Sequence, residues 1–192
     1  MRLLVALALA TLCAATAVAA GPKSYPASRA AVPPKDLDRL FTALKNAGSG
    51  EEAKPIEDRI TAAFLRSGSP TIDLLMTRAA AALQGGEVAT AKKLIASVTE
   101  IAPQYAEGWH QRGVMQAAAG DDQGAMFCLE KAVTLNPRHF EAMAELASKV
   151  EEYGDKPTAL KLYRKALALD PHYDSLERKV RALEHEVEGE SL

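Results

Sequence analysis

Three markers recur along this chain at a strict spacing of 34 residues. A glycine, an alanine and a proline each return after that interval without an insertion, as Gly86, Gly120 and Gly154, as Ala91, Ala125 and Ala159, and as Pro103, Pro137 and Pro171. A fixed period of this length is typical of stacked repeats, in which each unit buries its apolar face against its neighbours. The spacing predicts units at residues 72–105, 106–139 and 140–173.

Each unit has the pattern of two helices joined by a tight turn. The glycine falls where a first helix of about fourteen residues ends, and glycine readily adopts the left-handed conformation found there. An acidic residue follows each glycine (Glu87, Asp121 and Asp155) and suits the start of a second helix. The proline falls where that second helix must stop. The repeated alanine lies inside the second helix, where a larger side chain should overpack and cost about 1–3 kcal/mol.

The composition also favours an all-α fold. The 192 residues are 48% hydrophobic but only 5% aromatic, with abundant alanine and few β-branched residues, which favours packed helices over sheets. The chain has 23 basic and 25 acidic residues, a formal net charge of −2. This balance argues against nucleic acid as a partner, because phosphate binding requires a clear basic excess.

The units resemble tetratricopeptide (TPR) repeats, whose pattern runs from a large residue through glycine and alanine to an aromatic residue and a closing proline. The matching positions beyond the periodic markers are Trp109, Gly113 and Tyr163. Trp109 falls on the large-residue position, so we expect it to pack between the two helices of its own unit. The resemblance implies an all-α, right-handed superhelix of helix-turn-helix units, although Arg78 and Arg112 replace the leucine of the pattern.

The segments on either side of the repeats also have helical spacing. Residues 36–69 are expected to form a degenerate helical hairpin that caps the N-terminal end of the repeats. Residues 174–189 place Leu176, Val180, Leu183 and Val187 on one face, which predicts a helix that caps the C-terminal end. The same apolar face leaves open a self-assembling structural protein, in which this helix pairs with a second copy.

Residues 1–20 have the pattern of a secretory signal peptide. Arg2 precedes an apolar run, and small residues precede two candidate cleavage sites, after Ala19 or after Ala20. Residues 21–35 contain four prolines and predict a flexible linker. The mature chain should then have no membrane span and lie in the periplasm, which a resemblance to short secreted bacterial TPR proteins also implies. The alternative is an inner-membrane anchor formed by an uncleaved signal.

In TPR units, positions 2, 5, 9 and 12 of each first helix line the concave face, which implies a groove for a partner. These positions are Asp73, Met76, Ala80 and Leu83, then Glu107, His110, Val114 and Ala117, then Glu141, Ala144, Ser148 and Glu151. The groove is apolar in the middle and acidic toward the third unit. It should therefore bind an apolar or basic segment of another protein rather than an acidic C-terminal tail. The alternative is a solvated helix face.

The sequence contains no constellation that indicates catalysis. Cys128 lies in a repeat helix without a histidine base nearby in the sequence, and His110, His139, His172 and His185 are scattered without a metal or haem motif. No catalytic residue, cofactor or metal is therefore expected. The sequence favours an exported scaffold of envelope assembly or maintenance. The alternatives are the self-assembling protein described above and a non-catalytic accessory subunit of an envelope enzyme complex.

Overall fold

The computed structural model describes residues 34–173 and 176–189, and within these ranges it contains nine α-helices and no strand. The helices are α1 (Pro34–Lys45), α2 (Gly50–Phe64), α3 (Pro70–Gln84), α4 (Val88–Ile101), α5 (Ala106–Ala118), α6 (Asp122–Leu135), α7 (Phe140–Glu152), α8 (Lys156–Leu169) and α9 (Leu176–Glu188). The all-α fold is confirmed. The expected signal peptide and residues 21–33 of the expected linker lie outside the described residues. None of the described helices is both long and apolar enough to span a bilayer.

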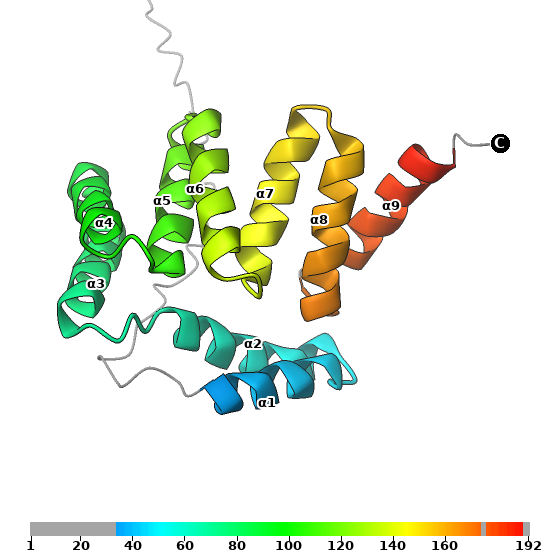
Figure 1. Cartoon of the computed structure of the whole chain (residues 1–192), viewed down its shortest axis with the longest axis horizontal. Coiled ribbons are helices and arrows are strands. Elements are labelled where there is room, and N and C mark those ends of the chain that lie inside the picture. Colours follow the sequence, from blue (N-terminus) through cyan, green and yellow to red (C-terminus); the bar gives the residue numbers. More distant parts are fainter. Residues whose placement is uncertain (1–33, 174–175, 190–192) are drawn as a thin grey trace, which may run out of the picture.

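Helices α3 to α8 form three hairpins, α3–α4, α5–α6 and α7–α8, which stand side by side (Figure 1). The turn glycines Gly86, Gly120 and Gly154 have φ angles of 75°, 76° and 90°, the left-handed conformation that the sequence predicts. Two of the acidic residues that follow them act as caps. Asp121 accepts a hydrogen bond from the backbone N–H of Gly124, and Asp155 caps α8 in the same way.

Small residues allow the helices of each hairpin to approach closely. The repeated alanines Ala91, Ala125 and Ala159 are completely buried. At Gly113 of α5, a Cβ atom would lie 2.9 Å from Cγ of Leu129 in α6, so no larger residue fits without a shift of that side chain. The periodic small residues therefore mark the helix contacts within each repeat.

The helix α9 covers the last repeat, as the sequence predicts. Leu176, Val180 and Leu183 are buried in a core shared with α8. On the rim of this contact, Arg164 of α8 forms ion pairs with two glutamates of α9, at 2.7 Å and 2.8 Å. The apolar face that suggested self-assembly is thus buried within the chain itself.

The α1–α2 hairpin does not cap the first repeat, and this expectation was wrong. It runs along the edge of the array below α5, α7 and α8, and shares a core with α7, α8 and α9 (Figure 1). Phe41 of α1 packs edge-on against Phe140 of α7, with ring centroids 6.4 Å apart. The Arg138 guanidinium stacks on Phe41 and forms an ion pair with Asp38. The apolar spacing of residues 36–69 predicts a buried face, but it does not specify which helices bury it.

Two carboxyl groups face each other where this hairpin meets the end of α8. Burial raises the pKa of Glu57 in α2, and the charge of Asp170 raises it further. Burial likewise raises the pKa of Asp170, whose Oδ1 accepts the backbone N–H of His172 at 3.0 Å. The buried Oδ2 of Asp170 lacks a hydrogen-bond donor. Glu57 can supply one only when its carboxyl group is protonated.

We expect Glu57→Gln to stabilise the protein at neutral pH by about 1 kcal/mol, because the amide donates a hydrogen bond at any pH and removes a like charge. A carboxyl group with a raised folded pKa contributes stability below its unfolded pKa, and that stability is lost as pH rises through the folded pKa. The wild type should therefore lose stability above about pH 4.5, and the variant should lose less. Urea denaturation at several pH values measures this. Glu51→Gln, at an exposed position of α2, is the control; equal effects of both variants would contradict the interpretation.

Candidate functional site

The concave face has a closed half and an open half. The closed half lies in the first turns of α3, α5 and α7, where five of the twelve residues expected to line the groove are buried, namely Asp73, Met76, Glu107, His110 and Ala144. The open half lies further along the same helices, where Leu83 and Val114 are exposed and Ala80, Ala117, Ser148 and Glu151 are partly exposed. A groove open along its whole length is therefore not observed.

The acidic part of the groove already has partners within the chain. Glu141 accepts a hydrogen bond from the Thr61 hydroxyl of α2 at 3.1 Å. Glu151 accepts one from the Tyr163 hydroxyl at 2.8 Å and forms an ion pair with Lys179 of α9 at 3.0 Å. These contacts offset the negative charge that the sequence places beside the third unit.

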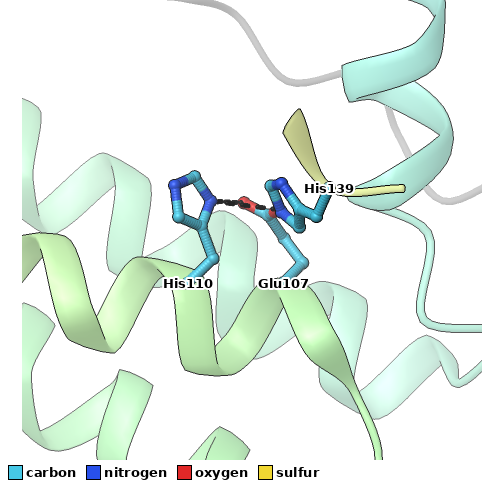
Figure 2. Close-up of side chains that lie close together, drawn as sticks. All are labelled: Glu107, His110 and His139. Carbon is cyan, nitrogen blue, oxygen red and sulfur yellow. Dashed lines mark hydrogen bonds and ion pairs between the residues drawn. The ribbon is translucent and has the colours of Figure 1, made fainter. Parts of the chain in front are cut away.

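Three side chains converge in the closed half, Glu107 and His110 from α5 and His139 from the residue before α7 (Figure 2). Their exposed fractions are 2%, 4% and 0%. His139 Nε2 lies 2.9 Å from Glu107 Oε2, and His110 Nδ1 lies 3.4 Å from both Glu107 oxygens. Gln111 donates a hydrogen bond to Glu107 Oε1 at 2.7 Å. The buried carboxylate is thus surrounded by donors.

The surroundings of His139 specify where its proton lies. The residue is the N-cap of α7, and its Nδ1 accepts the backbone N–H of Ala142 at 3.4 Å. Because Nδ1 accepts a hydrogen bond, Nε2 carries the proton and donates a hydrogen bond to Glu107. The His139 ring also lies against Phe64 of α2, with centroids 4.8 Å apart, so the hairpin covers this side of the cluster.

His110 lies between two carboxylates. Its Nε2 is 3.1 Å from Glu145 Oε2 on α7, and its Nδ1 faces Glu107. Burial alone would lower the pKa of His110, but the charge of Glu107, and then of Glu145, raises it well above its ordinary value. Burial would raise the pKa of Glu107, but His110 and His139 outweigh burial and lower it. At neutral pH the cluster is therefore an imidazolium–carboxylate ion pair.

In the sequence His110 and His139 are scattered without a metal motif, so this cluster was not expected. The first helices of adjacent repeats stand side by side with their starts at one edge of the array (Figure 1). His139 is the last residue of the second unit, so it precedes α7 and lies beside the first turn of α5. Glu107, His110 and His139 are positions 2, 5 and 34 of the second unit. A mapping that included position 34 would have revealed that these three residues lie together.

Comparison with known proteins agrees with this architecture. Residues 106–139 match the family model of the tetratricopeptide repeat, the same limits that the 34-residue period gives for the second unit. The chain is a TPR protein. TPR folds suggest scaffolds for interactions between proteins, and such repeat proteins are in general not catalytic.

Relatives in sequence and in structure are of the same kind. A TPR repeat-containing protein of Rhizobium etli is 28% identical over 157 residues, which cover 82% of this chain and 77% of that protein. The Sgt2 TPR domain from Aspergillus fumigatus superimposes with a TM-score of 0.55 at 22% identity, covering 64% of this chain and 82% of that one. The first TPR of Spaghetti (RPAP3), bound to the HSP90 peptide SRMEEVD, gives a TM-score of 0.55 at 15% identity, covering 61% and 93%.

In this TPR protein, Trp109 contributes to packing but is only partly buried. The indole packs against the apolar cluster that α6 and α7 share, and its edge-on contact with Phe127 has a centroid distance of 6.0 Å. Its Nε1 donates a hydrogen bond to the carbonyl of Pro103 at 2.9 Å, which joins the first repeat to the second. The tryptophan therefore connects two repeats, beyond the role within one unit that the sequence suggested.

Cys128, which the sequence places in a repeat helix, is buried in α6. Its thiol donates a hydrogen bond to Gln116 Oε1 at 2.9 Å. Burial raises the pKa of this thiol, which disfavours the thiolate that a nucleophile needs.

Loss of Glu107 should destabilise the protein far more than loss of Glu145. Glu107→Ala leaves a buried imidazolium without its main counter-ion, which should lower the free energy of unfolding by about 3–5 kcal/mol. The Glu145 side chain is 40% exposed, so Glu145→Ala should lower it by about 0–1 kcal/mol. Urea denaturation at neutral pH measures both, and similar losses would contradict the assignment of Glu107 as the central anion.

Proposed function

We propose that this TPR protein is an exported scaffold that binds a segment of another protein in the open half of its concave groove. The observation that carries the proposal is the exposure of Leu83 and Val114, 41% and 38%, on the first helices of adjacent repeats. Ala80 and Ala117 lie beside them on the same helices and leave room for a partner side chain. Apolar residues of this kind on a helical groove are the means by which amphipathic segments dock.

The chemistry of the groove favours an apolar segment with basic rather than acidic flanks. The twelve positions mapped to the concave face include four carboxylates and no lysine, arginine or asparagine. An acidic tail would find no lysine, arginine or amide side chain at these positions to pair with. The TPR of RPAP3 is bound to a peptide that ends in Glu-Glu-Val-Asp, so we propose a different class of partner for this chain.

The pattern of residues 1–20 supports export to the periplasm. The alternative is a protein anchored in the inner membrane by an uncleaved signal. In the periplasm a non-catalytic TPR scaffold would serve envelope assembly or maintenance. Fractionation of cells and sequencing of the mature N-terminus test this part separately. A first residue of Gly21 or Ala20 in the periplasmic fraction supports export and cleavage, and a protein that stays in the cytoplasm with Met1 in place contradicts them.

A photo-crosslinking residue at Val114 should capture one dominant protein in intact cells, because Val114 is exposed whereas the neighbouring groove residue His110 is buried. With the same probe at Val114, the Leu83→Asp variant should lose at least about tenfold of that adduct, since a buried unpaired charge opposes docking. Mass spectrometry identifies and quantifies the adduct.

Val88→Asp is the matched control, because Val88 is 55% exposed at the start of α4 and lies outside the mapped groove. Both aspartate variants should change the free energy of unfolding by less than about 0.5 kcal/mol. Equal adduct yields with Leu83→Asp and Val88→Asp, or adducts with this chain alone, would rule out a dedicated groove for another protein.

A further inference from the structure

In the Glu107–His110–His139 cluster, one nitrogen of each imidazole ring faces the carboxylate that lies between them (Figure 2). One ligand atom of each residue lies within 4.8 Å of the other two. The three side chains are buried, and they come from two elements, the first turns of α5 and the residue before α7. Two histidines with one glutamate are a donor set that Zn²⁺ and similar divalent metals take in proteins.

Two distances between ligand atoms in the cluster are close to those expected around a bound metal ion. Donors bound tetrahedrally at zinc bond lengths of about 2.0–2.1 Å lie about 3.4 Å from one another. His110 Nδ1 lies 3.4 Å from Glu107 Oε2, which is long for a hydrogen bond but close to this separation. His139 Nε2 lies 2.9 Å from the same oxygen, so these two atoms need to part by about half an ångström.

The residues that surround the three ligands are already placed as they are around bound metals. Histidine ligands of metals generally donate the second ring nitrogen to a carboxylate or carbonyl, which fixes the ring and its tautomer. The second nitrogen of His110, Nε2, lies 3.1 Å from Glu145 Oε2. Gln111 holds the second oxygen of Glu107 at 2.7 Å, which leaves Oε2 directed at the two histidines. The partly exposed Glu145 marks the side of the cluster that is nearest to solvent.

We propose that Glu107, His110 and His139 form a binding site for Zn²⁺ or a similar divalent transition metal. The ligand atoms are Glu107 Oε2, His110 Nδ1 and His139 Nε2, with water in the fourth position, as in zinc sites with three protein ligands. The metal displaces the proton of His110 Nδ1 to solvent, and the proton of His139 moves from Nε2 to Nδ1. His139 then carries its proton on Nδ1 and gives up the 3.4 Å contact with the N–H of Ala142, which is at the limit of a hydrogen bond.

This site would join the second and third repeats. Glu107 and His110 belong to the second repeat, whereas His139 sets the position of α7 and contacts Phe64 of the hairpin. A bound metal therefore stabilises the edge at which α5, α7 and α2 meet. The inference goes beyond the proposed function, because it requires no partner protein.

The test uses the full, tag-free chain after treatment with a chelator, in reducing buffer at neutral pH. Co²⁺ is added first, because four-coordinate Co²⁺ gives strong visible absorption, and Zn²⁺ is then added as a competitor. We expect one Co²⁺ per chain, displacement by one Zn²⁺, and an unfolding midpoint that rises with Zn²⁺ concentration, since the ligand binds only the folded state. No visible band together with no shift of the midpoint would overturn the proposal.

A graded set of variants separates this site from other donors. His110→Gln and Glu107→Gln should each weaken Zn²⁺ binding by more than about 100-fold, and Glu145→Gln, which acts through His110, by about 10- to 100-fold. His185→Gln, on the exposed face of α9, is the control and should bind as the wild type does. Far-UV circular dichroism of each variant shows that it is folded. Should Glu107→Gln unfold, His110→Gln and Glu145→Gln still decide the question.

Two further outcomes would assign the metal elsewhere. A near-ultraviolet charge-transfer band from thiolate to Co²⁺ would place a cysteine in the site. Binding that survives His110→Gln but is lost in His185→Gln would place the metal on the surface of α9. Either result overturns the proposal.

Discussion

A two-helix hairpin leaves an apolar face that it cannot bury alone, and this constraint organises the whole chain. Each repeat covers its predecessor, and α9 covers the last repeat with Leu176, Val180 and Leu183. The α1–α2 hairpin has the same need, but it meets it along the edge of the array, against α7 and α8. That position determines which half of the concave face is closed, and therefore which residues remain available to a partner.

The fold could be predicted from the sequence because its signals are local and periodic. The turn glycines, the buried alanines and the apolar face of α9 each report a contact within one repeat or between neighbours, and the structure has them as expected. The position of the α1–α2 hairpin could not be predicted in this way. Its contacts with Phe140 and Asp170 join segments about a hundred residues apart, for which the helical spacing of residues 36–69 carries no information.

The site was predictable only in part, for a related reason. The concave positions followed from the repeat pattern, and Leu83 and Val114 are exposed there. The burial of Glu107 and His110 depends on the α1–α2 hairpin, which the pattern does not place, and on His139, which lies at position 34 of its unit and outside the four mapped concave positions. Charge was also misjudged, because Glu141 and Glu151 have partners on α2, α8 and α9 that only the folded chain brings near.

The link between Asp38 and Arg138 has a consequence for the order in which the protein acquires its structure. The two residues are a hundred positions apart, so α1 emerges from the ribosome long before the residue that it contacts. The repeats can assemble from local contacts, whereas the hairpin must close a long loop before it gains any stabilisation from docking. Phe41 therefore stays without its contact to Phe140 until the third repeat exists. Among the helices that the structure describes, the first to be synthesised are thus among the last to reach their final position.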